Sequence, residues 1–383
     1  MELPLGFTAH VANVGIKDDT TDFVVVAADE PCNASAVFTR SRFAGPSVEI
    51  SRRHAADHRL QAVVVVSKNA NVATGDPGRA DAEELAAGTA AAIGCEVGDV
   101  LVASTGVIGR RYPMDRLRAH LGELRGPFTG TSADDVAAAI MTTDTHPKTA
   151  EAALPNGARI VGVAKGVGMI EPDMATMLAF VLTDAEVPAA DLDGTFRHVV
   201  ARTFNSLSVD SDTSTSDTAA VLASGRAGAV DLDEFAAALH AVCLDLTRQL
   251  AADGEGAETL IVVDVAGARD DDQAKRVAKA IVNSPLVKTA VHGADPNWGR
   301  VAMAIGKCAE DTDIDQSRVR ISFGDREVYP TPIGDAELRE LEVYLRGDEV
   351  LIGVDLGTGE QAWTVYGCDL TDGYVRINAD YTT

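Results

Sequence analysis

The sequence is poor in aromatic residues and cysteine, and it has no long apolar run. Aromatics make up 5% of the 383 residues, so a core must come mainly from Val, Ala, Leu and Ile. The five cysteines are widely spaced without a CxxC pair, which favours reduced thiols over disulfides or a zinc site. No run approaches the ~18 apolar residues of a membrane span, and the N-terminus does not resemble a signal peptide. These absences predict a cytoplasmic protein without a metal site.

Positive charge is also scarce. The chain has 33 Lys and Arg against 58 Asp and Glu, a net charge of −25. Nucleic acids and anionic membranes are bound through clustered Lys and Arg, so the composition argues against both partners. The length exceeds the ~100 to 200 residues usual for one domain, and 46% of the residues are hydrophobic. We therefore expect two packed lobes or one large domain.

Short apolar runs alternate with alanine-rich amphipathic stretches. QAVVVVSKNA (61–70), GRADAEELAAGTAAAIG (78–94) and DVLVASTGVIG (99–109) indicate a strand, a helix and a strand. The same patterns predict further helices at 113–124, 132–141, 189–206, 232–252, 272–282 and 335–346, and strands near 160–167, 176–182, 260–265 and 319–323. The class is α/β, or α+β with large sheets.

GARDDDQ (267–273) is the best candidate for a lobe boundary, because turn and charged residues cluster there between a strand and a helix. It divides the chain into a main lobe, 1–268, and a smaller C-terminal lobe, 269–383. The last segment, YVRINADYTT (374–383), keeps strand-like residues to its final position. This composition predicts a docked terminal strand.

Three polar segments could bind ligands. DLGTG (355–359) resembles a phosphate-binding turn of actin-like ATPases, but its isolation between two strand-like runs favours a glycine hairpin turn. EDTDID (310–315) lacks the sixth-position glycine and closing glutamate of a calcium loop, which favours a solvated turn. SDTSTSDT (211–218) is either a hydroxyl-rich ligand loop or a turn of capping residues. Among scattered histidines, His292 stands out, and a structural role is favoured for it.

Thr176 lies in an unusually apolar setting, VAKGVGMIEPDMATMLAF (163–180). A threonine at a chain terminus has its α-amine, of ordinary pKa about 7.7 to 8.0, beside its own Oγ as a base. Such a terminus arises when Oγ attacks the carbonyl of Ala175 in an N→O acyl shift and the ester is hydrolysed. The motif alone favours the plainer interpretation, a β-branched residue in a buried strand.

GMIEPDMATML (168–178) resembles the self-cleavage motif of the ornithine acetyltransferase family, the glutamate N-acetyltransferases of arginine biosynthesis, whose pattern is G-M-I-x-P-x-M-A-T-M-L. The resemblance covers nearly the whole chain. Its other segments are AVFTRSRFAGPS (36–47), KNANVATG (68–75), STGVIG (104–109), MTTDTHPK (141–148), DTSTSDT (212–218), DGEGA (253–257), NSPLVKTAVHGADPNWGR (283–300) and YVRINADYTT (374–383). So many segments in one order identify the chain as a member.

The resemblance implies a precursor that cuts itself between Ala175 and Thr176. The products would be an α chain, 1–175, and a β chain, 176–383, which stay together, usually as an α2β2 heterotetramer. The implied fold is an α/β sandwich like that of N-terminal-nucleophile enzymes, with its own topology, plus a smaller C-terminal α/β lobe.

The resemblance also assigns roles to residues. Thr176 would be the nucleophile, and Thr105 and Gly106 would form the oxyanion hole. Substrate contacts would fall on Thr142 or Thr143, Lys165, Thr176, Glu255, Asn378 and Thr383. Lys165 can pair with the substrate α-carboxylate, and Glu255 with the ammonium that ornithine carries and glutamate lacks. The implied ping-pong reaction passes an acetyl group from N2-acetylornithine to Thr176 and then to glutamate, without a cofactor.

One departure from the family pattern bears on the activity. Glu171 and Asp173 are acidic where arginine-pathway members often carry His and Asn, and the paralogue associated with clavulanic acid clusters has the same acidic residues. This favours a transacetylase that does not use acetyl-CoA over the bifunctional enzyme. A self-processing amidase or aminopeptidase is the alternative enzyme, and a nucleotide-binding module that uses DLGTG is the non-enzymatic one.

Overall fold

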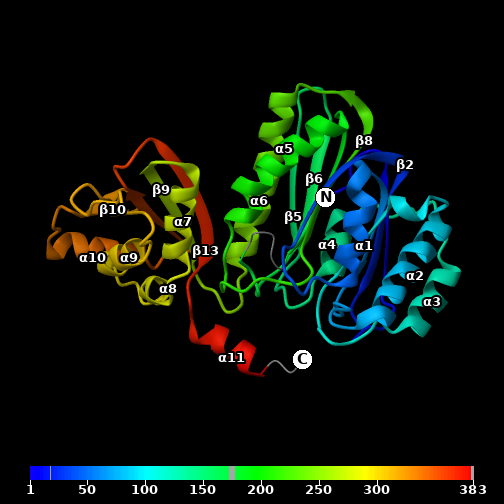
Figure 1. Ribbon diagram of the computed structural model, residues 1–383, viewed down its shortest axis with the longest axis horizontal. Coiled ribbons are helices and arrows are strands. Elements are labelled where there is room, and N and C mark those ends of the chain that lie inside the picture. Colours follow the sequence, from blue (N-terminus) through cyan, green and yellow to red (C-terminus); the bar gives the residue numbers. More distant parts are fainter. Residues whose placement is uncertain (18, 172–176, 381–383) are drawn as a thin grey trace. The chain divides into compact units, whose positions relative to one another are not determined.

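The computed structural model describes residues 1–17, 19–171 and 177–380, which form two compact units with one sheet each (Figure 1). The first unit comprises 1–204 and 212–246, and the second comprises 205–211 and the described chain from Thr247 onward. The mixed α/β class is confirmed. No described helix is both long enough and apolar enough to cross a membrane.

The first unit is built on an eight-stranded sheet of order β4-β3-β2-β8-β7-β6-β5, with β1 paired to β2. Its strands are β1 (Phe7–Ala12), β2 (Phe23–Phe38), β3 (Arg59–Val66), β4 (Val100–Ser104), β5 (Lys148–Ala153), β6 (Arg159–Lys165), β7 (Leu178–Glu186) and β8 (Thr218–Ala229). Its helices are α1 (Pro46–His54), α2 (Gly75–Ile93), α3 (Met114–Glu123), α4 (Ala133–Ile140) and α5 (Ala189–Arg202), and α6 (Leu232–Ala252) starts in this unit.

Both faces of this sheet are buried. Successive side chains of a strand point to opposite faces, so Phe23 and Val25 of β2 pack in the core cluster that holds Leu85 of α2. Val24 and Val26 pack in the other cluster, with the apolar side chains of α4. Burial on both faces explains why strands such as β3 read as continuous apolar runs rather than as alternating ones.

The second unit is built on a five-stranded sheet of order β11-β10-β12-β9-β13. Its strands are β9 (Leu260–Ala268), β10 (Arg320–Phe323), β11 (Arg326–Tyr329), β12 (Glu349–Asp355) and β13 (Gln361–Cys368). Its helices are α7 (Asp271–Val282), α8 (Pro285–His292), α9 (Trp298–Gly306), α10 (Asp335–Tyr344) and α11 (Asp372–Asp380).

The division between the units falls earlier in the chain than the boundary expected at 267–273. β9 pairs with both β12 and β13, so it is an interior strand of the second sheet. The chain must therefore enter the second unit before Leu260. GARDDDQ is the turn that joins β9 to α7, with Asp270 as the helix N-cap.

The prediction of a hairpin turn at DLGTG (355–359) is wrong. The segment joins β12 to β13, and these strands lie on opposite sides of β9 rather than next to each other. The N–H groups of Thr358 and Gly359 both donate to the carbonyl of Gly267, at 2.7 and 2.9 Å. These amides are already engaged, which also counts against a phosphate-binding turn.

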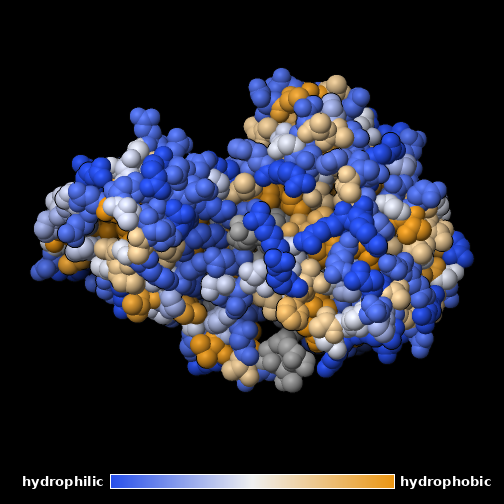
Figure 2. Space-filling view, viewed as in Figure 1, coloured by the Kyte–Doolittle hydropathy of each residue, from blue (hydrophilic) through white to orange (hydrophobic). Residues whose placement is uncertain are grey.

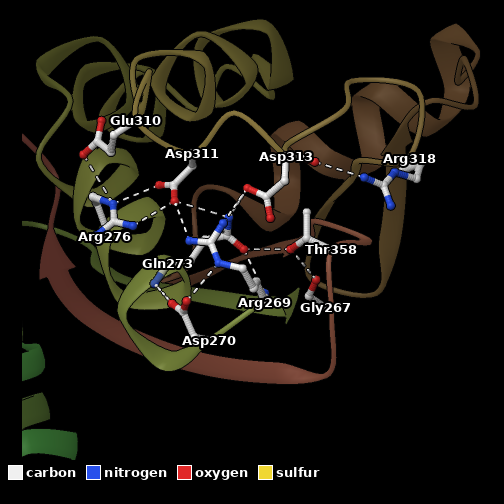
Figure 3. Close-up of polar contacts among 10 residues, drawn as sticks. All are labelled: Gly267, Arg269, Asp270, Gln273, Arg276, Glu310, Asp311, Asp313, Arg318 and Thr358. Carbon is white, nitrogen blue, oxygen red and sulfur yellow. Dashed lines mark hydrogen bonds and ion pairs between the residues drawn. The ribbon is translucent and has the colours of Figure 1, made fainter.

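The acidic segment 310–315 is a turn in which Glu310 and Asp315 are exposed, as predicted, but Asp311 is buried. Asp311 belongs to an ion-pair network (Figure 3). The Asp311 side chain is 1% exposed, and its carboxylate accepts hydrogen bonds from Arg276 at 2.8 Å and from Arg269 at 3.2 Å. Asp313 accepts from Arg269 at 2.7 Å. Two arginines thus occupy the carboxylates that a calcium ion would need.

The C-terminal segment, predicted as a strand, is the helix α11 over its described part. Thr371 is the reason, because its hydroxyl accepts the N–H groups of Gly373 at 3.0 Å and Tyr374 at 3.4 Å, as an N-cap does. Asp372 in the first turn pairs with Arg376 at 2.7 Å, in the spacing that favours a helix.

Figure 2 shows hydrophilic side chains over most of the molecular face in view, as the net charge predicts.

Candidate active site

The predicted cleavage point lies outside the described residues, but its two flanks are described. Outside them are Ala175, Thr176 and Thr383. On one flank, the N–H of Glu171 donates to the carbonyl of Asp212 at 2.9 Å. On the other, the N–H of Met177 donates to Oδ1 of Asp217 at 2.7 Å. Both flanks are therefore fixed to the segment that runs from Asp212 to the start of β8.

Asp217 is a fully buried acid, and it contacts Met177, the residue that follows Thr176. Its Oδ2 is buried and has no hydrogen-bond partner among the described residues. Burial raises the pKa of Asp217 well above its usual range, although the N–H of Met177 and the charge of Lys165 act in the opposite direction. The site thus holds this carboxyl toward its neutral, protonated form.

Asp144 joins the segment MTTDTHPK (141–148) to Gly166, the residue after Lys165. Its Oδ1 accepts from Lys148 Nζ at 2.9 Å and from the N–H of Gly166 at 2.6 Å, and its Oδ2 accepts from the N–H of Thr142 at 3.1 Å. Burial alone would raise the pKa of Asp144, but the charges of Lys165 and Lys148 outweigh it and lower the pKa. This carboxylate is ionised and ties the two segments together.

Lys165 is the last residue of β6, is 3% exposed and pairs in register with Leu178 of β7. Lys148 is fully buried as well. Burial favours the neutral form of Asp217, and the charges of Lys165 and Lys148 lower the pKa of Asp144. A carboxylate is the ligand that a buried lysine such as Lys165 would suit. Thr142, half-buried, begins the neighbouring loop, and Thr143 is exposed.

Thr105 and Gly106 follow β4 and lie beside the segment 68–75. Gly106 has φ +125°, and a Cβ there would come within 2.2 Å of the carbonyl carbon of Lys68, so only glycine fits. Thr105 is 3% exposed, and its Oγ1 is buried without a hydrogen-bond partner in the described chain. Buried hydroxyls are normally paired, so this one is a donor available to a ligand.

The segment 36–47 connects these two groups of residues. Its Gly45 N–H donates to the carbonyl of Thr215 at 2.9 Å, in the loop that leads to Asp217. Ser47 lies 3.2 Å, hydroxyl to hydroxyl, from Ser104, the residue before Thr105. The first unit therefore brings the predicted oxyanion residues and the acid beside the cleavage point onto one connected set of loops.

Glu255 and Asn378 meet in the second unit, as their shared predicted role requires. Asn378 Nδ2 donates to Oε2 of Glu255 at 2.9 Å. Gly256 enables this approach, since it has φ +68° and a Cβ there would lie 2.4 Å from the Tyr374 backbone nitrogen. Glu255 and Tyr374 line a cavity of about 130 Å³, to which Lys288 also contributes.

His292 has the structural role that the sequence favoured. Its Nδ1 lies 3.2 Å from Oδ2 of Asp369, and Oδ1 of Asp369 accepts the N–H groups of Glu258 and Thr259 at 2.9 and 3.1 Å. Ligand-type atoms of Glu258, His292 and Asp369 lie within 4.8 Å of one another. The two backbone N–H groups fix Oδ1 of Asp369, and Oδ2 is the oxygen that faces His292.

Four residues of these sites were not predicted from sequence: Asp144, Lys148, Asp217 and Lys288. Asp144 and Lys148 lie within MTTDTHPK, Asp217 lies within SDTSTSDT and Lys288 lies within NSPLVKTAVHGADPNWGR, so each belongs to a segment that the sequence had singled out. Their signal was an acid or a lysine in an otherwise apolar or hydroxyl-rich setting. Which groups they contact could not be read without the fold.

Comparisons with known proteins cover nearly the whole chain. A family model described as the ArgJ family matches residues 8–383. Glutamate N-acetyltransferase Oat2 of Streptomyces clavuligerus is 57% identical over 99% of this chain and 98% of its own. Arginine biosynthesis bifunctional protein ArgJ of Rhodococcoides fascians is 53% identical over 99% of this chain and 94% of its own. The crystal structure of ArgJ from Bacillus halodurans matches with a TM-score of 0.50 and 42% identity, over 53% of this chain and 98% of that chain.

Proposed function

The chain belongs to the ArgJ family and is a glutamate N-acetyltransferase, and we propose that it transfers the acetyl group from N2-acetylornithine to glutamate through an acetyl ester on Thr176. The observation that carries this mechanism is the buried, unpartnered Oγ1 of Thr105 beside Gly106. A donor held in place without a partner suits a negative charge that forms only during the reaction.

Self-cleavage comes first. Thr176 Oγ attacks the carbonyl carbon of Ala175, the peptide C–N bond breaks, and the Oγ proton ends on the new α-amine. Water then hydrolyses the ester, which leaves a carboxyl on Ala175 and a free hydroxyl on Thr176. The chain from Thr176 onward is 208 of the 383 residues. The matched Bacillus halodurans chain covers 53% of this one, which is close to the size of the product that starts with Thr176.

Acetyl transfer then proceeds in two halves. The Thr176 α-amine removes the Oγ proton while Oγ attacks the acetyl carbonyl of N2-acetylornithine. Thr105 Oγ1 and the Gly106 N–H stabilise the oxyanion, and ornithine leaves with the proton from the amine. In the second half the amine of glutamate attacks the acetyl ester, and N-acetylglutamate and the free hydroxyl are released.

Substrate binding is divided between Lys165 and Glu255. Lys165 pairs with the α-carboxylate beside the buried ion pair of Asp144 and Lys148. Glu255, with Asn378 beside it, accepts the side-chain ammonium of ornithine. Thr142 or Thr143, the Thr176 amine and Thr383 complete the proposed contacts, and the α and β chains assemble as an α2β2 heterotetramer.

Glu171 and Asp173, of which Asp173 lies outside the described residues, favour a transacetylase that does not use acetyl-CoA. The test is formation of N-acetylglutamate from glutamate with N-acetylornithine or with acetyl-CoA as donor. Product from N-acetylornithine alone supports the proposal, and product from both donors makes the enzyme bifunctional. Release of acetate in place of N-acetylglutamate would overturn the proposed acetyl transfer and would indicate an amidase.

A further inference from the structure

The proposed reaction sets a recognition problem at the substrate side chain. The same acetyl-threonine must serve ornithine, whose side chain ends in an ammonium, and glutamate, whose side chain ends in a carboxylate. Glu255 provides a partner for the ammonium only. A carboxylate next to the acidic side chain of Glu255 would be repelled, so the acceptor needs a cation that the family resemblance did not supply.

Lys288 on α8 is such a cation. It is 5% exposed, and its Nζ donates to the carbonyl oxygen of Val209 at 2.8 Å and to that of Cys368. It forms no ion pair with a carboxylate in the described chain, and its remaining contact is the weak acceptor Sγ of Cys368 at 3.9 Å. An ammonium has three N–H donors. Two neutral carbonyls satisfy two of them and leave the charge uncompensated.

Lys288 and Glu255 line the same cavity, whose volume of about 130 Å³ has room for the end of a short side chain. Two further acids line its wall. Asp369 accepts backbone N–H groups and contacts His292, and Asp210 lies 3.4 Å from the hydroxyl of Tyr374. Lys288 is the cation among these lining residues.

We propose that Lys288 binds the side-chain carboxylate of glutamate in the cavity where Glu255 binds the side-chain ammonium of ornithine. This inference rests on the proposed function and adds the determinant of acceptor specificity. The two substrates then use one cavity in turn, each paired with the residue of opposite charge. A charge-assisted hydrogen bond of this kind is worth about 10- to 100-fold in binding.

The test compares glutamate with glutamine as acceptors, with N-acetylornithine as donor. The side-chain amide of glutamine keeps the shape of glutamate and removes the charge. The wild-type enzyme should prefer glutamate by about 10- to 100-fold in kcat/KM, and Lys288→Met should reduce this preference to within about threefold. Lys279→Met is the matched control, because Lys279 also donates to a carbonyl, that of Leu207 at 2.6 Å, but does not line the cavity.

A structural role for Lys288 would lower the rates with both acceptors and leave the preference unchanged, and that result overturns the assignment. If Lys288→Met does not fold, Lys288→Arg should keep the preference for glutamate over glutamine. The wild-type enzyme also tests the proposal by itself, because equal kcat/KM for glutamine and glutamate would overturn the role of Lys288. Absence of transfer to either acceptor in the wild type is a different result, since it refutes the proposed function itself.

Discussion

Replacing Thr105 with valine removes one hydroxyl and keeps the shape of the side chain. Because Oγ1 of Thr105 is buried and has no hydrogen-bond partner in the described chain, the change breaks no contact of the resting protein. The free energy of unfolding should stay constant or rise by up to about 1 kcal/mol, since a buried polar group is exchanged for a methyl.

The rate should respond in the opposite way. Loss of one oxyanion donor typically lowers kcat by about 10²- to 10³-fold, which corresponds to about 2.7 to 4 kcal/mol of transition-state stabilisation. The assay is acetyl transfer from N-acetylornithine to glutamate, with the rate divided by the cleaved fraction seen on a denaturing gel, because self-cleavage uses the same donor. Urea unfolding of the same preparation supplies the stability.

Thr89→Val is the matched control. Thr89 is also buried in the first unit, but its hydroxyl donates to the carbonyl of Leu85 at 2.8 Å. This change should cost about 1 kcal/mol of stability and leave the rate within a few-fold. The reasoning is refuted if Thr105→Val keeps a rate within threefold of the wild type, or loses stability as Thr89→Val does.

Three further substitutions test the surrounding structure. Gly106→Ala would place a Cβ 2.2 Å from the Lys68 carbonyl carbon at φ +125°, and it should lower the unfolding free energy by about 1 to 3 kcal/mol or more; an unchanged thermal midpoint would contradict this. Asp217 has a raised pKa in the fold, so its favourable contribution is present below the unfolded pKa and is lost as pH rises through the folded one. Asp217→Asn should therefore become more stable relative to the wild type between about pH 4 and pH 8 in urea titrations, and a difference that is constant with pH would count against it. Asp311 has a pKa lowered chiefly by its hydrogen bonds to Arg276, so its contribution is present above the unfolded pKa and is lost as pH falls through the folded one. Asp311→Asn should cost about 1 to 2 kcal/mol at neutral pH and much less in acid, and equal costs at both pH values would show that the ion pairs do not matter.

Local signals predicted the helices and strands that depend on them. The amphipathic run at 232–252 is α6 with the same bounds, and the helix expected at 132–141 is α4, with Ser132 as its N-cap. The expected strand near 160–167 is β6, because a strand buried on both faces reads as an apolar run. Each of these predictions depends on residues that are neighbours within one helix or strand.

Features that depend on distant segments were not predictable. The turn at DLGTG looked like a hairpin because its sequence cannot show that β9 lies between the strands it joins. Thr371, whose hydroxyl caps the terminal helix, is itself fixed by a hydrogen bond to the carbonyl of Gly256, at 2.6 Å and 115 positions away along the chain.

The candidate site divides in the same way. Thr105, Gly106 and Lys165 were found from motifs, which mark positions without showing contacts. Asp217 belongs to the site because it accepts a hydrogen bond from the N–H of Met177, 40 positions away along the chain, and because it is completely buried in the fold. Its segment, SDTSTSDT, could be read as a ligand loop or as a capping turn, and the sequence alone could not decide between them.

The most direct test of the acetyl-threonine mechanism is intact-mass spectrometry of the wild-type protein incubated with N-acetylornithine, before and after glutamate is added. The account predicts two chains that meet at the Ala175–Thr176 bond, one acetyl group on the chain that starts with Thr176, and loss of that group to N-acetylglutamate on addition of glutamate. Thr176→Ala should give one uncut chain without an acetyl group. An uncut wild-type chain that transfers acetyl groups, or a cut enzyme whose acetyl group is on another residue, would contradict the account.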